Sequence, residues 1–238
     1  MTFILSFITM FMLVKYLTKS ALSGAVAGCA YSLCPYHFSH ECYITLYNIQ
    51  WIPLFALSLC LLERNRTLYL TVISSLLWAC VAYGDAYYGY MTMIMAGIFM
   101  LWNKFDIKII LRFLIFSILL IMPFALWSIT DWQPRVLISP IPVVAKLSDY
   151  FYPNWGNGIE HYLYILPAWI ILAGIGLRKH NLFWGIICLL CLFLSLVEPI
   201  CPIFRVSARW GIMVMLGVSV LAGYGFKRLL QVEQKEVN

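Results

Sequence analysis

Residues 108–131 read KIILRFLIFSILLIMPFALWSITD. The stretch begins with Lys108 and Arg112, continues as an apolar run, and reaches its first acidic residue at Asp131. An apolar run of about 20 residues can cross the hydrocarbon core of a bilayer as a helix. Short segments rich in Lys and Arg stay in the cytoplasm. The stretch therefore predicts a transmembrane helix with a cytoplasmic basic start and an acidic outer end.

The same alternation extends over the whole chain. We predict about nine apolar spans, over residues 2–18, 20–35, 47–62, 67–84, 88–103, 108–127, 162–177, 182–197 and 210–227. Every second gap is basic, and these gaps hold Lys15, Lys19, Arg64, Arg66, Lys104, Lys108, Arg112, Arg178, Lys179, Lys227 and Arg228. Backbone groups in hydrocarbon need internal partners, so the spans are expected to be helices. The prediction is an all-α, polytopic transmembrane helical bundle with its N-terminus outside and its C-terminus in the cytoplasm.

Composition supports a membrane protein. Hydrophobic residues make up 63% of the chain and charged residues only 11%, as expected because charged side chains are costly in hydrocarbon. The net charge of +6 does not indicate a nucleic-acid partner, since most basic residues cap predicted cytoplasmic ends, where anionic lipid headgroups would hold them. We expect one transmembrane domain over residues 1–230, with an outer loop at about 127–161, and a short cytoplasmic tail over 231–238.

Gly24 and Gly28 lie one helical turn apart in a segment of small side chains. Small residues at this spacing let two membrane helices approach closely. The pattern predicts helix packing at this face.

His37, His40 and Glu41 form the first candidate site on the predicted outer side. If residues 37–49 form an interfacial helix, the three side chains share one face. That face could bind a divalent metal or supply a general base. Two histidines and one acid are a weak metal signature, so a solvated polar loop is the competing interpretation.

Asp85 and two arginines are further candidates on the same side. Asp85, at the outer end of a span, could bind a sugar hydroxyl or a cation, or could cap the following helix. Arg205 and Arg209 would project together from a helical turn and could grip a phosphate. The competing interpretation of the arginines is an ion pair with Glu198 or Glu160.

The outer loop is rich in aromatic residues. It carries Trp127, Trp132, Tyr150, Phe151, Tyr152 and Trp155. Aromatic residues at this depth usually form an interfacial belt, although their faces could also stack on sugars. Phosphate-binding loops, dinucleotide-binding motifs, zinc-protease motifs and serine-hydrolase motifs are all missing from the sequence. Nothing therefore indicates nucleotide binding or a serine hydrolase.

Several stretches of the chain are distinctive: residues 21–37, Gln50-Trp-Ile-Pro53, Leu61-Leu-Glu-Arg64, Phe204-Arg-Val-Ser-Ala-Arg209 and Leu221-Ala-Gly-Tyr-Gly225. Together they resemble bacterial membrane proteins of the GT-C glycosyltransferase class. The resemblance covers about residues 10–227. It implies a multi-pass enzyme of the bacterial cytoplasmic (inner) membrane that takes a sugar from a polyprenyl-phosphate carrier. The sugar would pass to an envelope lipid, glycan or protein on the outer face.

The resemblance also implies roles for the outer residues. A carboxylate would act as base on the acceptor hydroxyl, and basic residues or a divalent metal would hold the leaving phosphate. The loop at 35–41 resembles the second outer loop of the class, so Glu41 is the best candidate that the resemblance carries over. The expected catalytic residues are Glu41, His40 and Asp85, and the expected substrate- or phosphate-binding residues are Arg205, Arg209, His37, Trp132 and Glu160.

The sequence departs from the class at its start. In the class, a first span and a large outer loop with the main catalytic acid precede the region that resembles residue 1 onward. The chain is therefore expected to be a fragment, to receive the acid from a second chain, or to be no longer an enzyme. Two alternatives to the transferase stay open: a non-catalytic subunit of an envelope glycan assembly system, and a transporter or flippase. The transporter ranks last because few charges fall deep inside the predicted spans.

Overall fold

The computed structural model describes residues 1–40, 48–130, 144–152, 163–197 and 206–236. Within these ranges the chain is helical and contains no β-strand. The α-helices are α1 (Thr2–Thr18), α2 (Ala21–Ser32), α3 (Pro35–Ser39), α4 (Trp51–Asn65), α5 (Leu68–Gly84), α6 (Ala86–Trp102), α7 (Ile107–Thr130), α8 (Pro167–Gly176), α9 (Leu182–Leu196) and α10 (Gly211–Glu236). Three short 3-10 helices are η2 (Leu147–Tyr150), η4 (Lys179–Asn181) and η5 (Ser207–Trp210).

The all-helical prediction is confirmed over the described residues. Each predicted apolar span contains one α-helix, and α3 is an additional short helix. Three segments are long and apolar enough to cross a membrane: Ile107–Leu126, Lys179–Leu196 and Ser207–Glu233. The helices α1, α5 and α6 have 17 residues each and are slightly shorter than the roughly 20 residues that usually cross a bilayer. These three segments support the prediction of a membrane protein. The last helix, α10, continues to Glu236, well beyond its predicted end at residue 227.

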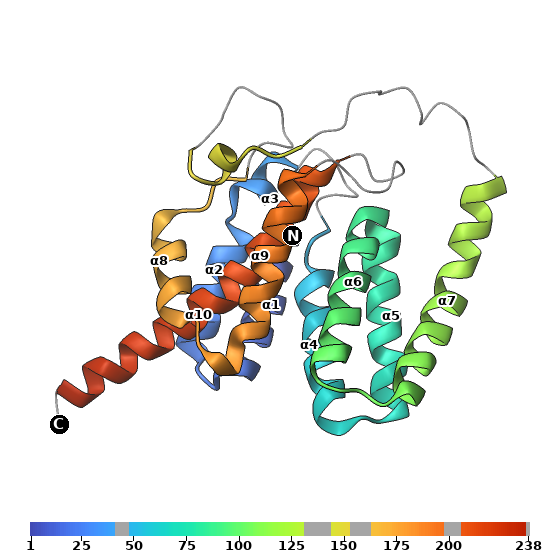
Figure 1. The fold of residues 1–238 in the computed structure, drawn as a ribbon, viewed down its shortest axis with the longest axis horizontal. Helices are drawn as coiled ribbons and strands as arrows, with labels where there is room; N and C mark the ends of the chain where they lie inside the picture. The colour runs from blue at the N-terminus through green and yellow to red at the C-terminus, as the bar shows by residue number, and fades with distance from the viewer. Residues whose placement is uncertain (41–47, 131–143, 153–162, 198–205, 237–238) are drawn as a thin grey trace.

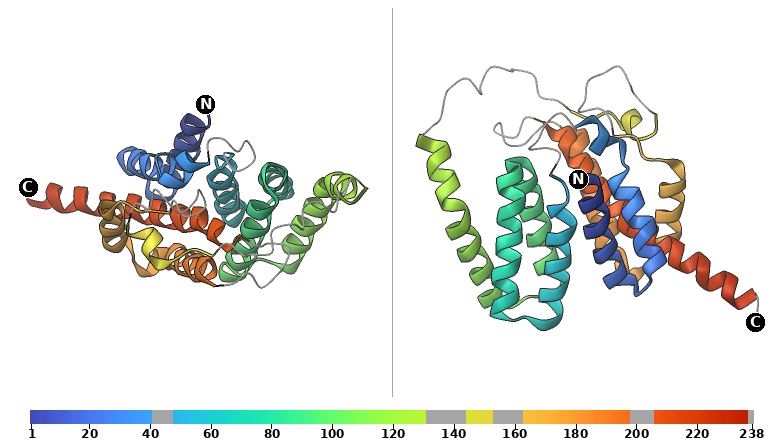
Figure 2. Two further views of the ribbon diagram at one scale, coloured as in Figure 1. Left: turned by 90° about the horizontal axis from the view of Figure 1, so that it is seen from above. Right: turned by 180° about the vertical axis from the view of Figure 1, so that it is seen from behind.

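The helices form two neighbouring groups (Figure 1). In the first group, α10 packs against α1, α2, α8 and α9. In the second, α5 packs against α4, α6 and α7. Contacts of α1 with α4 and of α6 with α9 join the groups, and the views from above and behind show the same division (Figure 2). The apolar part of α10 is 72% buried, against 17% for α7, so α10 is the central helix and α7 a peripheral one.

The turns at the basic end share one backbone feature. Lys19, Arg66 and Lys104 follow α1, α4 and α6, and each has a positive φ, of 58°, 47° and 50°. This left-handed conformation commonly ends a helix, although it costs a non-glycine residue about 1 kcal/mol. A positive side chain at a helix C-terminus interacts favourably with the helix dipole. Basic residues therefore terminate three helices at this end of the bundle.

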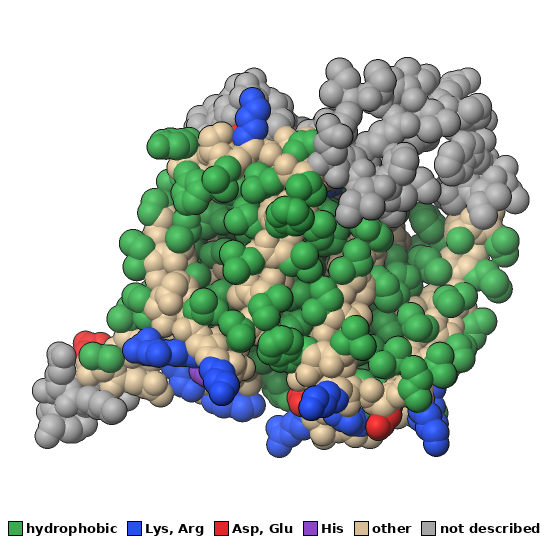
Figure 3. All heavy atoms as spheres, viewed as in Figure 1, with side chains coloured by type: hydrophobic (Ala, Val, Ile, Leu, Met, Phe, Trp, Pro, Cys, Tyr) green, Lys and Arg blue, Asp and Glu red, His purple; other side chains and the backbone are tan. Residues whose placement is uncertain are grey.

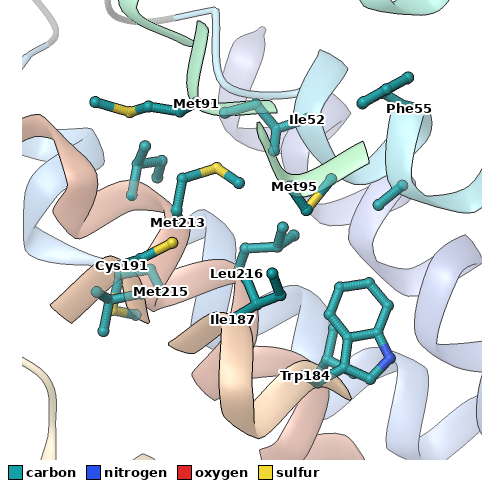
Figure 4. Packing of buried hydrophobic residues seen from close by; sticks show 14 of the residues in the cluster. Ile52, Phe55, Met91, Met95, Trp184, Ile187, Cys191, Met213, Met215 and Leu216 are labelled. Atoms are coloured by element: carbon teal, nitrogen blue, oxygen red, sulfur yellow. The ribbon is translucent and has the colours of Figure 1, made fainter. Parts of the chain in front are cut away.

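The hydrophobic core runs through both groups and across the junction between them. Met213 and Leu216 of α10 and Ile187 of α9 are buried and face Met91 and Met95 of α6 (Figure 4). Long, flexible methionine side chains fill irregular gaps between helices. The packing places the start of α10 beside the start of α6.

Small residues bring particular helices close together. A Cβ added at Gly24 would lie 2.9 Å from the Phe11 carbonyl oxygen, and one at Gly28 would lie 2.8 Å from the Phe7 ring. The predicted packing role of these two glycines is therefore confirmed, and their partner is α1. Gly176 of α8 and Gly225 of α10 are tighter still, because a Cβ on either would collide with the backbone of the other helix.

Charge and apolar surface are separated on the outside of the molecule. Figure 3 shows a broad band of hydrophobic side chains, with Lys and Arg gathered along the lower edge. Hydrogen bonds join separate helices at this edge. For example, Lys227 Nζ donates to the Thr18 carbonyl oxygen at 2.7 Å, and Arg66 Nη2 donates to the Asn103 carbonyl oxygen at 3.1 Å. The predicted basic gaps thus lie together at one end of the bundle.

Candidate functional site

Asp85 occupies the turn between α5 and α6, at the end of the bundle opposite the basic edge (Figure 1). Its Oδ1 accepts hydrogen bonds from the backbone N–H groups of Tyr87 at 2.9 Å and Tyr88 at 3.3 Å. These are N-cap bonds, which satisfy amides at the start of a helix that have no partner within it. The capping interpretation of Asp85 is confirmed, and the cap fixes where the carboxylate lies.

Arg209 faces Asp85 from η5, which leads directly into α10. Its Nη1 lies 3.7 Å from Asp85 Oδ2, with side chains only 17% and 11% exposed, respectively. The guanidinium carbon also lies 4.5 Å above the centre of the Tyr87 ring, where the π electrons attract a cation. A charge-assisted hydrogen bond would be shorter, at about 2.7–2.9 Å. The two charges are therefore paired in a sheltered position without a tight hydrogen bond between these atoms.

Tyrosines extend this polar cluster to α3. The Tyr88 and Tyr36 hydroxyls lie 3.0 Å apart and share a hydrogen bond. The Tyr36 ring stacks on His40 with ring centres 4.1 Å apart, and His40 Nδ1 lies 2.8 Å from the Tyr36 carbonyl oxygen. A connected series of polar groups thus runs from Arg209 through Asp85, Tyr88 and Tyr36 to His40. We call these five residues the outer cluster.

His37 and His40 do not share a site. His37 Nδ1 lies 2.9 Å from the Ser32 carbonyl oxygen, and its ring packs against Phe3 of α1 at 4.1 Å. His40 instead contacts Tyr36 and the Ser39 hydroxyl. Both histidines are fully buried, and α3 ends at Ser39. Residues 41–47, within the segment considered for an interfacial helix, lie outside the described residues. Each ring is oriented by its own neighbours.

The remaining predicted site residues, Glu41, Arg205, Trp132 and Glu160, lie outside the described residues. Among the residues that are described, no group of three His, Cys, Asp or Glu side chains could hold a metal ion. Asp85 is one partner of Arg209 in the structure; the sequence places the two residues on the same side of the membrane but does not predict that they pair. The roles of Tyr36 and Tyr88 were missed, although the run of tyrosines directly after Asp85 was a signal that could have indicated them.

Comparison of the chain with known protein families, curated proteins and solved structures gives no match. Function is therefore inferred from the outer cluster, the separation of charge, and the residues that carry the GT-C resemblance.

Proposed function

We propose that the protein is a multi-pass protein of the bacterial cytoplasmic membrane that transfers a sugar from a polyprenyl-phosphate carrier at its outer end, in the manner of the GT-C class. The observation that carries the proposal is the sheltered pairing of Asp85 with Arg209. A carboxylate and a guanidinium side by side are the two groups that this reaction needs. They lie at the opposite end of the bundle from the basic edge.

The proposed orientation follows from the basic edge. Lys and Arg in short connections stay in the cytoplasm, so the turns at Lys19, Arg66 and Lys104 would face inward. The outer cluster would then face outward, where a lipid-linked sugar is presented after crossing the membrane. We propose about nine spans in this orientation, with the N-terminus outside and the C-terminus inside. The shorter helices would cross with the help of their neighbours, since a short span can be accommodated by local thinning of the bilayer.

The proposed chemistry assigns one role to each charge. The acceptor hydroxyl attacks the anomeric carbon, the bond from that carbon to the phosphate oxygen breaks, and polyprenyl phosphate leaves. Asp85 takes the proton of the acceptor hydroxyl, and Arg209 stabilises the negative charge on the leaving phosphate. The guanidinium has five N–H donors in a planar fork that matches phosphate geometry. The 3.7 Å separation from Asp85 is consistent with an arginine that changes partner when phosphate arrives.

The test is sugar transfer by the purified chain in proteoliposomes with a radiolabelled polyprenyl-phosphate sugar. Asp85→Asn is expected to lower the transfer rate by about 100-fold or more, the usual effect of losing a positioned base. Arg209→Gln is expected to lower it by about 100-fold or more through loss of phosphate stabilisation. Asp106→Asn, which removes one acidic charge at the opposite end, is the matched control and should stay within about twofold of the unsubstituted protein. Normal transfer by both outer variants would refute the assignment.

A second candidate is a non-catalytic subunit of an envelope glycan assembly system. The favouring observation is that Asp85 already has two structural tasks, capping α6 and pairing with Arg209. In that case the chain alone would bind a lipid-linked sugar without turning it over, and a second chain would supply the catalytic acid. Binding without turnover by the unsubstituted chain, followed by turnover when a partner chain is added, would establish this candidate.

A further inference from the structure

A polar cavity lies at the basic edge, far from the outer cluster. It has a volume of about 260 Å³ and is lined by the side chains of Arg178, His180, Lys227, Arg228, Tyr224 and Gln231, together with Gly176 of α8. The turn between α8 and α9 supplies the first two of these side chains, and α10 supplies the others. We call this cavity the basic pocket.

The turn that carries Arg178 and His180 is held in place by Asn181. The Asn181 side chain is 2% exposed. Its Oδ1 accepts from the Arg178 backbone N–H at 2.7 Å, and its Nδ2 donates to the Gly176 carbonyl oxygen at 2.9 Å. Because the oxygen and the nitrogen of this buried side-chain amide are both hydrogen-bonded to the backbone, Asn181 fixes the conformation of the turn. The side chains of the turn are therefore presented from a rigid base.

Hydrogen bonds also position the α10 side of the basic pocket. Lys227 Nζ donates to the Thr18 carbonyl oxygen at 2.7 Å, and Arg228 Nη1 donates to the Ile175 carbonyl oxygen at 3.3 Å. An ammonium group has three donors and a guanidinium has five, so these bonds hold the side chains while leaving capacity for a ligand. The adjoining Gly176 and Gly225 contact brings α8 and α10 together at this point.

Charge in the basic pocket is one-sided. Three permanent cations and one histidine line it, and none of the described residues that line it is acidic. Two other basic residues at this edge have neighbours that offset their charge: Arg66 pairs with Asp106 at 3.8 Å, and Lys19 lies 4.3 Å over the Tyr16 ring. An adjacent cavity is lined by Glu63, and the two cavities share His180 and Tyr224. Like charges that converge repel one another unless an anion joins them.

The surroundings of the basic pocket indicate which anion. Leu177 lies between two pocket residues, and Ile171 and Leu229 lie on the helices that enter the pocket; all three are exposed. An apolar surface beside a phosphate-sized basic cavity suits acyl chains beside a headgroup, and basic pockets between membrane helices bind anionic lipid headgroups in this way. We propose that the basic pocket binds the phosphate headgroup of an anionic phospholipid in the leaflet at the basic end of the protein.

The test is lipid binding to the full-length chain in detergent, measured by native mass spectrometry with short-chain phosphatidylglycerol and phosphatidylcholine. Phosphatidylglycerol is expected to bind at least about tenfold more tightly, because it presents a phosphate without a compensating cation. The variant Arg178→Gln with Arg228→Gln should lose that preference. Lys227 is kept, since its bond to Thr18 is structural. The matched control is Lys108→Gln with Arg112→Gln, which removes two exposed charges at the same end on α7 and should keep the preference.

Three outcomes would overturn the proposal. Equal binding of the two lipids would show that the headgroup charge is not recognised. Equal losses in the pocket and control variants would show only general attraction between charges. Displacement of the lipid by inorganic phosphate at an equal concentration would identify a site for a soluble anion. If the double variant is unstable, Arg178→Gln alone repeats the test, because only the Arg178 backbone takes part in the bonds that hold the turn.

Discussion

The ion pairs Arg66–Asp106 and Arg209–Asp85 lie at opposite ends of the bundle and have nearly equal lengths, 3.8 and 3.7 Å. Their surroundings differ. The side chains of the first pair are 38% and 71% exposed, and those of the second are 17% and 11% exposed. Water and salt screen the first pair, whereas the second has lost much of its solvation and depends on its protein neighbours. Separation alone therefore says little about what an ion pair does.

The comparison extends to the two ends themselves. At the basic end, Lys19 and Arg66 terminate helices, and both residues are exposed. At the outer end, Asp85 caps α6 and pairs with Arg209, and the neighbouring Tyr88 shares a hydrogen bond with Tyr36. The first two charges therefore lie on exposed turns, whereas the charges at the outer end are sheltered by their protein neighbours. We expect substitutions at the two ends to behave differently for this reason.

The largest expected effect is an all-or-none difference in chemical access between the ends. Lys146→Cys lies at the outer end and Lys108→Cys at the basic end, and both positions are exposed. In intact cells, a membrane-impermeant maleimide should label only Lys146→Cys, and lysis should make Lys108→Cys reactive. The native Cys34 should stay unlabelled because its side chain is only 2% exposed.

This labelling needs a background in which Cys42 and Cys201 are replaced by Ser, because both lie in predicted outer segments. Labelling of Lys108→Cys in intact cells, with Lys146→Cys protected until lysis, would reverse the proposed orientation and place the outer cluster in the cytoplasm.

The next effect in size is the loss of the sheltered pair. Asp85→Ala removes both the cap and the charge and should lower the free energy of unfolding by about 3 kcal/mol. Asp85→Asn keeps a capping oxygen and should cost about 1 kcal/mol less. At about 2–4 °C per kcal/mol for a chain of this size, thermal unfolding in detergent separates the two variants. An unchanged midpoint for Asp85→Ala would show that the pair is not coupled to the fold.

The smallest effect is expected at the exposed pair. Asp106→Asn should change the free energy of unfolding by less than about 0.5 kcal/mol, and the change should vanish in high salt. Asp106 is the informative partner, because Arg66 also donates to Asn103 and lies 5.2 Å over the Phe105 ring. The same thermal measurement, repeated at low and high salt, checks this result. A loss comparable to that of Asp85→Ala would remove the contrast between the two ends.

Sequence predicted the helices well because the apolar stretches and the residues that interrupt them are local signals. Three predictions of this local kind are confirmed: the basic turns, the packing role of Gly24 and Gly28, and the capping alternative for Asp85. The pairing of Asp85 with Arg209 was not predicted, because it depends on how α6 and η5 meet through the packing of α10. A single sequence does not show which distant segments contact one another in the folded protein.

The histidines show that closeness in sequence does not by itself predict a shared site. His37 and His40 are close enough in sequence to suggest one site, yet each is oriented by a different neighbour, Phe3 for the first and Tyr36 for the second. Helical spacing describes which side chains share a face only where a helix continues. Since α3 ends at Ser39, His40 lies beyond the helix, and the helical spacing does not bring it onto the same face as His37.

The central position of α10 has a consequence for biosynthesis. A ribosome delivers α1 and α2 to the membrane long before it completes α10, yet a Cβ at Gly223 of α10 would touch both Val14 of α1 and Ala27 of α2. Until α10 arrives, the α1 and α2 surfaces that it covers must face lipid or an insertion factor, and α8 lacks the backbone contact at Gly225. The first helix group is therefore expected to reach its packed form only after α10 has been synthesised, because this one helix fills the positions left open by four others.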